Sequence, residues 1–316
     1  MKPGHIKHID VAKGIGIILV LIGHIFHRGM IDFIYLFHMP LFFFLSGFTM
    51  SPQNGLHFLS KKIKSLIVPY FSFLLLITTI NVIDSIISGS LSLKDIIKPY
   101  TSSLYGGAIL RGDFGAYWFI TVLFLSLLIL NWMIINMKNK HATICIVLMY
   151  VFSFIDSFYL DKSPPFAINI VLQSIPIMYI GYLSSGNERL LKRLAMIGII
   201  FTPLYFIFPH DIISVDFKQS SYGIPVINTL ISLSFIYAVI YISKKLENST
   251  VLTVIASGSM TIMFLHQWFN LRLVKAGVDN SLAVFLITLL TCLFIHEILN
   301  KNDSSRAFFI GRGIKR

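Results

Sequence analysis

Apolar residues fill most of the chain in long runs that short polar connections separate. Ten of these runs approach the roughly 20 residues that an α-helix needs to cross a bilayer. We expect them at 11–28, 33–50, 65–87, 115–136, 141–158, 166–184, 191–208, 224–243, 251–271 and 281–299. The pattern predicts an all-α integral membrane protein, a bundle of about ten transmembrane helices that forms one membrane-embedded domain over residues 1–316.

The first apolar run follows Lys2 and Lys7, as it would in a secretory signal peptide. No small-residue cleavage site follows the run, and His24, His27 and Arg28 interrupt its far end. We therefore expect a retained first membrane span, with a cleaved signal as the alternative.

The connection from Ser88 to Gly115 is the one long interruption between apolar runs. It contains SGSLSLKD and YGGAILRGDFG, in which glycines mark turns. We expect a polar loop with a short surface helix here.

Composition supports the same class. Hydrophobic residues make up 55% of the chain, charged residues 13%, and the mean hydropathy is +0.78. In a soluble domain, roughly a quarter of all residues would be charged. The net charge of +12 is compatible with nucleic-acid binding, but in so apolar a chain it favours basic cytoplasmic loops, and we expect no nucleic-acid partner. Cys145 and Cys292 fall inside apolar runs, where they are expected to pack.

Basic residues give the orientation. If the N-terminus is cytoplasmic, seventeen lysines and arginines fall in inner segments and eight in outer ones. The positive-inside rule favours this arrangement, and an even number of spans returns the basic C-terminal tail to the cytoplasm. We therefore expect both termini to be cytoplasmic, in a multi-pass membrane protein.

Lys13 and His24 lie within the first apolar run, in IDVAKGIGIILVLIGH. Ionisable side chains inside a bilayer are costly and usually mark a pathway or a site. Eleven positions make about three helical turns, so both side chains share one face, roughly 16 Å apart along the axis. This spacing suggests a long anionic ligand that is bound at one end and reacts at the other.

Two further histidines fall at a similar predicted depth. His38 begins the second run, in FHMPLFFFLSGF, and His266 ends the ninth, in SGSMTIMFLHQWF, close to Trp268. Trp118 opens the fourth run on the same outer side. Lys13 lies toward the inner side, together with the basic cluster Lys61, Lys62 and Lys64. A polar shaft through the bundle would join the two groups.

Simpler interpretations compete with this one. Any single histidine near a helix end can be an interfacial residue that reaches toward water. The two tryptophans can belong to the aromatic belts, and the three clustered lysines can merely fix topology. Ser46 and Gly47 in FFFLSG are expected mainly to permit tight helix packing. His5 and His8 lie three residues apart without further ligands, so we expect no metal site.

These motifs resemble the membrane acyltransferase 3 family, especially its branch of fucose 4-O-acetylase-like and other polysaccharide O-acetyltransferases. The matching segments are IDVAKGIGIILVLIGH, FHMPLFFFLSGF, KKIKSLIVPYF, YWFITVLF and SGSMTIMFLHQWF, in the order of the family. Many members have arginine where this chain has Lys13, so the charge is kept while the two-pronged phosphate contact is not. The chain resembles the stand-alone form without a second extracytoplasmic domain.

The resemblance implies acetyl-CoA as co-substrate, a sugar hydroxyl of a polysaccharide or its lipid-linked precursor as acceptor, and no bound cofactor. Lys13, Lys61, Lys62 and Lys64 would hold the phosphates, with Asp10 pairing to Lys13 at i,i+3 spacing. His24 would be the general base. His38 and His266 would orient the acceptor, stabilise the oxyanion or relay a proton, and Trp118 and Trp268 would contact the acceptor. Direct transfer and an acetyl-histidine intermediate both stay open.

Two other classes fit an apolar chain with buried ionisable groups. A glycan or lipid transporter or flippase would show paired repeats with broken helices, and no such pairing is evident in the sequence. A structural membrane subunit would not explain three histidines at one depth. The lipid bilayer is an expected partner, and a homo-oligomer is compatible with the pattern.

Overall fold

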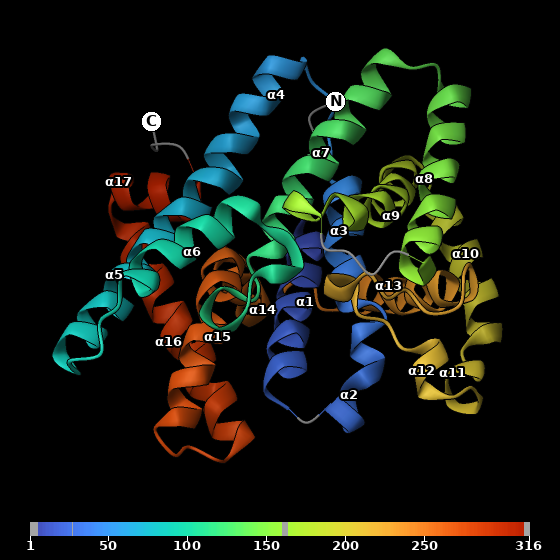
Figure 1. Cartoon of the computed structure of the whole chain (residues 1–316). Coiled ribbons are helices and arrows are strands. Elements are labelled where there is room, and N and C mark those ends of the chain that lie inside the picture. Colours follow the sequence, from blue (N-terminus) through green and yellow to red (C-terminus); the bar gives the residue numbers. More distant parts are fainter. Residues whose placement is uncertain (1–5, 27, 160–163, 313–316) are drawn as a thin grey trace. The chain divides into compact units, whose positions relative to one another are not determined.

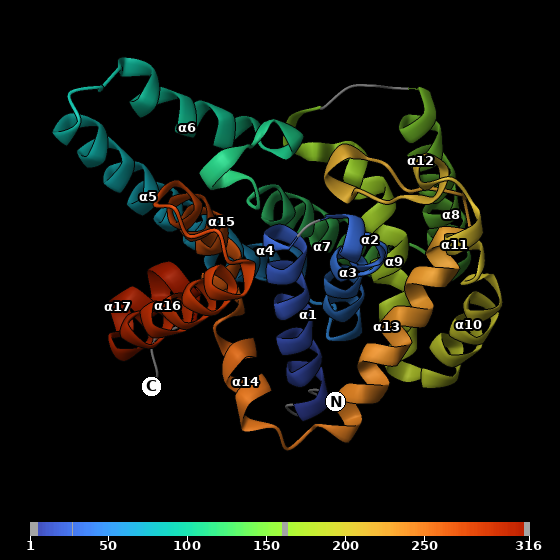
Figure 2. The same ribbon diagram turned by 90° about the horizontal axis from the view of Figure 1, so that it is seen from below.

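The structure, a computed structural model, describes residues 6–26, 28–159 and 164–312. Lys2, His5 and His27 therefore lie outside the described residues. Within these ranges the secondary structure is helical, with a single isolated bridge between Asp216 and Ser221. The helices are shown in Figure 1 and, from below, in Figure 2.

The described chain divides into two compact units, which we consider one at a time. Unit 1 comprises Met1–Gly55, Leu125–Lys162 and Asn169–Ser259. Unit 2 comprises Leu56–Phe124, Ser163–Ile168 and Met260–Arg316. The chain passes from unit 2 into unit 1 within one helix, α7 (Trp118–Asn136).

Unit 1 is built around the N-terminal helix. Its helices are α1 (Lys7–Ile25), α2 (Arg28–Tyr35), α3 (His38–Phe48), α8 (Asn139–Tyr159), α9 (Ile168–Gly186), α10 (Glu188–Phe201), α11 (Leu204–Ile207), α12 (His210–Ile213), η5 (Phe217–Gln219), α13 (Ile227–Lys245) and α14 (Thr250–Ser257). Helix α1 packs against α14, α13 and α3, while α10 lies along α13 (Figure 2). Glycine permits the α1–α14 contact, because a side chain at Gly14 would overlap the carbonyl oxygen of Leu252.

Helices α3 and α9 approach each other through a reciprocal pair of glycines. A side chain at Gly47 would overlap the carbonyl oxygen of Met178, and one at Gly181 would overlap that of Phe44. Small residues let helix backbones come this close in a membrane, where packing drives association. The tight packing expected for the FFFLSG segment is therefore present.

Unit 2 surrounds the helix that follows the lysine cluster. Its helices are α4 (Gly55–Lys62), η1 (Ile63–Ile67), α5 (Val68–Ile87), α6 (Leu93–Tyr105), η2 (Gly107–Ile109), η3 (Gly112–Phe114), the first part of α7, η4 (Pro165–Ala167), α15 (Ser259–Lys275), α16 (Ser281–Lys301), α17 (Asp303–Ser305) and η6 (Arg306–Ile310). Its core is aromatic: Tyr70, Phe73, Tyr117, Phe264 and Phe309 meet at centroid distances of 4.7 to 6.4 Å.

The expected surface helix in the long connection is α6. The chain turns after α5, and α6 then runs back toward the start of α7 (Figure 2). The hydroxyl of Tyr70 on α5 donates to the carbonyl oxygen of Ser103 over 2.8 Å and so holds α6 in place. Gly106, with φ of +71°, ends α6 in a conformation that favours glycine.

The structure has eight described helices that are long and apolar enough to span a membrane, and nine if the interrupted pair α14–α15 is one span. This number of helices differs from the ten predicted spans because two of the predicted runs do not form one unbroken helix. The predicted run 33–50 is divided between α2 and α3, and its apolar helix covers only Asp32–Phe48. Pro40 has no N–H to donate to the carbonyl of Leu36, so the helix restarts with proline in its first turn.

The second departure lies in the predicted run 251–271. There the helix is interrupted at Gly258, between α14 and α15. Gly–Ser pairs such as those around Gly258 are common causes of helix breaks.

Candidate active site

The N-terminal half of α1 carries an ion pair. The ammonium of Lys13 lies 3.2 Å from Oδ1 of Asp10, one helical turn earlier, as the i,i+3 spacing predicts. Their side chains are 36% and 24% exposed. A pair this accessible contributes at most about 1 kcal/mol, so Asp10 does not hold Lys13 tightly.

His24 lies in the last turn of the same uninterrupted helix. The turns between Lys13 and His24 present Ile17, Val20 and Leu21 on this face, and all three are buried. The His24 side chain itself is exposed. The face thus has a cation at one end, an imidazole at the other and an apolar stripe between them.

Tyr35 joins the end of α1 to the start of α3. Its hydroxyl donates to the carbonyl oxygen of Gly23 over 2.6 Å. Its ring packs edge-on against the ring of His38, with 5.0 Å between centroids and 82° between planes. Because Gly23 precedes His24, one tyrosine brings both predicted histidines of unit 1 to the same end of that unit.

His38 is buried and its tautomer follows from its partner. Nδ1 lies 2.9 Å from the carbonyl oxygen of Ile34. A carbonyl oxygen only accepts, so Nδ1 carries the hydrogen. In the neutral ring, Nε2 is then the nitrogen that accepts a proton or a hydrogen bond.

His266 has the same arrangement on α15 in unit 2. It is fully buried, and Nδ1 lies 2.9 Å and 3.0 Å from the carbonyl oxygens of Ile262 and Met263. Nδ1 is again the donor, and Nε2 again the proton-accepting nitrogen of the neutral ring. His38 and His266 belong to different units, so the common depth of the three histidines stays a prediction.

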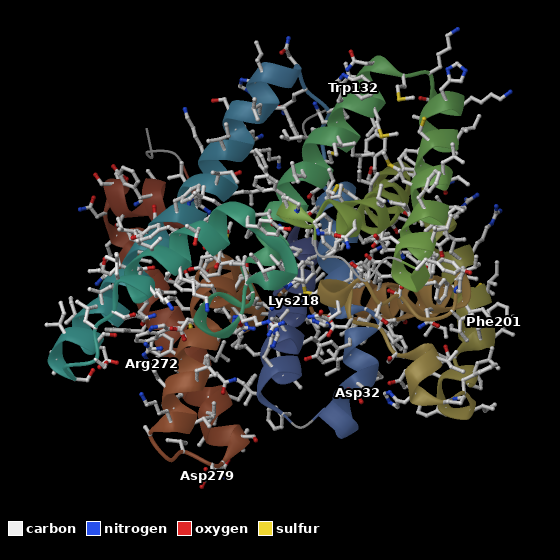
Figure 3. All side chains as sticks on the ribbon, viewed as in Figure 1. Asp32, Trp132, Phe201, Lys218, Arg272 and Asp279 are labelled. Atoms are coloured by element: carbon white, nitrogen blue, oxygen red, sulfur yellow. The ribbon has the colours of Figure 1, made fainter. Side chains whose placement is uncertain are left out.

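Trp268 takes part in a polar network rather than standing alone. Its Nε1 donates to Oδ1 of Asn81 over 3.1 Å, and the guanidinium of Arg272 lies 4.0 Å from its ring centroid. Arg272 also donates to Asn81 over 2.5 Å and to Asp113 over 3.3 Å. Figure 3 labels Arg272 on the ribbon of α15. The network joins α5, η3 and α15 within unit 2.

Trp118 is buried at the start of α7 and contacts Phe119 edge-on, 6.2 Å between centroids. The start of α7 lies against α15, because a side chain at Gly115 would overlap Oε1 of Gln267. The start of α7, which carries Trp118, therefore meets the middle of α15, which carries Trp268, within unit 2.

The three clustered lysines lie on one helical stretch of unit 2. Lys61 and Lys64 are exposed, and the ammonium of Lys62 lies 5.1 Å from the ring centroid of Phe58. Lys64 falls in the π-helix η1, where Pro69 cannot donate to the carbonyl of Ser65. Lys13 belongs to unit 1, so a shared inner mouth of all four lysines stays a prediction.

Four residues of these networks were not predicted as site residues: Tyr35, Asn81, Asp113 and Arg272. The sequence contained a signal for Asn81. A side-chain amide within an apolar run costs free energy in a membrane unless it is hydrogen-bonded, so a partner was to be expected. In the sequence, Arg272 stands only among the eight outer basic residues, and Asp113 only within the loop segment YGGAILRGDFG. Among the described residues, no group of three or more His, Cys, Asp or Glu side chains is arranged to hold a metal ion.

Comparison with known proteins matches the chain to a family model. A family model described as an acyltransferase domain matches residues 6–309 and so runs through both units. No curated protein and no solved structure matches the chain.

Proposed function

This chain belongs to the acyltransferase 3 family and is a membrane acyltransferase, and we propose that it moves an acetyl group from acetyl-CoA to a sugar hydroxyl. The observation that carries the proposal is the polarity of α1, with Lys13 and His24 on one continuous helix and apolar residues between them. Coenzyme A has the same layout, with phosphates at one end, a thin pantetheine arm, and the thioester at the other.

Lys13 holds the phosphate end of the donor in this account. An ammonium is a compact point charge that binds phosphate without a fixed two-pronged geometry. Asp10 keeps Lys13 oriented while leaving it accessible. Lys61, Lys62 and Lys64 add positive charge on the cytoplasmic side. Ile17, Val20 and Leu21 are buried, so the pantetheine arm enters only when the packing on this face opens.

His24 acts as the general base. It takes the proton of the sugar hydroxyl as the hydroxyl oxygen attacks the thioester carbonyl carbon. A new C–O bond forms, the C–S bond breaks, and the proton passes from the imidazole to the departing thiolate of coenzyme A. The products are an acetyl ester and free coenzyme A. General-base assistance of this kind typically contributes ~10²–10⁴-fold.

The tautomers of His38 and His266 support one of their expected roles over another. With Nδ1–H held by backbone carbonyls, the neutral rings offer Nε2 as an acceptor. An unprotonated nitrogen orients a hydroxyl or takes its proton, but it does not donate to an oxyanion. We therefore place both histidines on the acceptor hydroxyl or in a proton relay, with Trp118 and Trp268 beside the acceptor.

The acceptor that fits this account is a polysaccharide or its lipid-linked precursor at the outer face of a bacterial cytoplasmic membrane. The predicted orientation places His24 toward that face, and coenzyme A is confined to the cytoplasm. The motifs quoted above favour the fucose 4-O-acetylase-like branch. The proposal needs no bound cofactor.

A transfer assay tests the proposal. Purified full-length protein in nanodiscs receives acetyl-labelled acetyl-CoA and glycan extracted from cells that lack the gene. We expect label in alkali-labile ester on the glycan, whereas a transporter would leave acetyl-CoA intact. The His24→Ala variant should lose ~10²-fold or more of the rate, and His141→Ala, an exposed histidine of α8, should retain it.

More than about a tenth of the wild-type rate in His24→Ala would exclude the base role, because that loss is too small for a general base. Label trapped on the protein after acid quenching would indicate an acetyl-enzyme intermediate, and its absence direct transfer.

A further inference from the structure

A polar pocket opens in unit 2, and its lining includes none of the residues that the sequence assigned to donor binding. It has a volume of about 340 Å³, near the lower end of ligand pockets. The last turns of α5, one face of α6 and the segment of η2 and η3 form its walls. Three basic residues line it, Lys94, Lys98 and Arg111, and all three are exposed.

Among the described side chains, Asp113 is the one carboxylate that lines this pocket. Its charge is already matched. Oδ1 accepts from the guanidinium of Arg272 over 3.3 Å, and Oδ2 accepts from the amide of Asn81 over 2.7 Å. The lining therefore keeps a surplus of positive charge, which selects an anionic ligand.

Hydrogen bonds cross-link the wall that carries Asn81 and Asp113. Asn81 Oδ1 accepts from both Trp268 Nε1 and Arg272, and the guanidinium of Arg272 stacks on the indole ring. The side chains of α5, η3 and α15 in this network thus hold one another in place. They are Asn81, Asp113, Trp268 and Arg272. Trp268, which is expected to contact the acceptor sugar, lies on α15, the helix that also carries His266. It therefore connects this wall to that helix.

Helix α6 gives the ligand a second property. Lys94, Lys98 and Ser102 recur every four residues and form the face that lines the pocket. Leu93 and Ile97 precede the lysines by one position, so they form an adjacent face, and they are 71% and 48% exposed. In a membrane protein, a helix with neighbouring basic and apolar faces lies in the bilayer interface.

We propose that this pocket binds the phosphate or diphosphate of a lipid-linked sugar acceptor. The cations meet the phosphate oxygens, while the apolar face of α6 and the exposed Ile86 and Ile87 at the end of α5 meet the lipid chain. The inference rests on the proposed acyl transfer. Of the two proposed acceptors, the polysaccharide and its lipid-linked precursor, it selects the precursor, in which the sugar is joined to lipid through phosphate. Anionic phospholipid headgroups carry the same chemistry and are the competing source.

Binding is measured first, so that the result does not depend on catalysis. The probes are farnesyl diphosphate and farnesol, which share the lipid chain and differ in the diphosphate. The full-length protein is held in nanodiscs of phosphatidylcholine. The triple variant Lys94→Gln, Lys98→Gln, Arg111→Gln is compared with Lys275→Gln, which removes an exposed cation of α15 outside the pocket.

We expect farnesyl diphosphate to bind the wild type and Lys275→Gln with equal affinity, and the triple variant at least roughly tenfold more weakly, because each charge-assisted contact is strong. Farnesol should bind all three proteins weakly and alike. The temperature of unfolding is measured without ligand as a control. We expect the same value for the triple variant and the wild type, which would show that the variant is folded. Equal affinity of the wild type and a folded triple variant for farnesyl diphosphate would overturn the inference.

A second arm separates the two sources of phosphate. Replacing phosphatidylcholine by phosphatidylglycerol should leave the affinity for farnesyl diphosphate within about twofold. Competition by phosphatidylglycerol that raises the dissociation constant tenfold would make the pocket a headgroup site and would also overturn the inference.

A kinetic arm ties the pocket to transfer. The ratio of kcat/KM for a diphosphate-linked lipid glycan to kcat/KM for the same glycan released from lipid should fall at least tenfold in the triple variant. An unchanged ratio would contradict the inference while leaving acyl transfer established. Absence of transfer to every acceptor by the wild type would instead refute the proposed function.

Discussion

Tyr35 caps a helix and positions a histidine at the same time. The last carbonyl groups of a helix lack partners within it, and the Tyr35 hydroxyl supplies one for Gly23. The same ring holds His38 edge-on. One side chain that makes no motif in the sequence thus contacts both the helix end that carries His24 and the ring of His38.

The Tyr35→Phe variant keeps the ring contact and loses the hydrogen bond. We expect a loss of about 0.5–1.5 kcal/mol in stability, the usual net contribution of one hydrogen bond. In the transfer assay, kcat should fall severalfold while KM for acetyl-CoA stays at the wild-type value, because Tyr35 positions reacting groups and does not bind the phosphates.

Tyr179→Phe is the matched control, since its hydroxyl bonds Thr143 at an exposed position of unit 1, 3.1 Å away. It should leave kcat unchanged. A wild-type kcat in Tyr35→Phe would remove the positioning role.

Substitutions of Lys13 test whether its positive charge binds the phosphates of the donor. Lys13→Ala should raise KM for acetyl-CoA and weaken its dependence on salt, because one charge contact to phosphate is lost. Lys13→Arg should keep much of the affinity, since the charge survives. Lys7→Ala, an exposed lysine on the same helix, serves as control. If KM does not move in Lys13→Ala, the lysine does not hold the phosphates.

At the scale of elements, the close contact of α3 with α9 depends on Gly47 and Gly181. Alanine gains up to about 1 kcal/mol of helix propensity over glycine, so packing must outweigh this gain for a substitution to destabilise. A side chain at Gly47 meets a backbone carbonyl that cannot swing away. Overpacking of this kind typically costs about 1–3 kcal/mol.

We therefore expect Gly47→Ala to unfold at a lower denaturant fraction than the wild type, and Gly186→Ala at the same fraction or a higher one. Gly186 is the last residue of α9, and a side chain there would meet no other atom. The Gly186→Ala variant therefore measures the effect of helix propensity without any change in packing. Reversible unfolding in mixed micelles measures both variants. Equal stability of the two would show that α3 and α9 do not rely on this contact.

Elements were predictable from the sequence where periodicity and length alone decide them. Eight of the ten apolar runs correspond to full-length helices, and α6 occupies the predicted surface position. The two exceptions arise at Pro40 and Gly258, where a local backbone effect interrupts an otherwise unbroken apolar run. Hydropathy averages over such single residues and does not register them.

The candidate site was less predictable, because it depends on contacts between distant positions. The Asp10–Lys13 pair follows from helical spacing, and it is present. The Asn81–Arg272 bond joins residues 191 positions apart, and the bond of Tyr35 to Gly23 crosses a turn that hydropathy does not reveal. Such pairs are set by tertiary packing, which no single-residue pattern encodes.

At the scale of the whole molecule, the acyltransferase family model covers residues of both units. The positive-inside count predicts cytoplasmic termini, which places Lys13 toward the donor's compartment and His24 toward the opposite face. The two residues are separated by roughly 16 Å of helix. Acetyl would therefore cross much of the membrane along α1 while coenzyme A stays on the cytoplasmic side.

Sealed inside-out vesicles test this central claim most directly. Their bath corresponds to the cytoplasm and their lumen to the outer face. Acetyl-labelled acetyl-CoA is added to the bath, and vesicles that carry His24→Ala serve as control. We predict labelled acceptor in the lumen, protected from esterase added outside, and free coenzyme A in the bath. Label confined to the bath-facing side of the membrane would contradict transfer along α1.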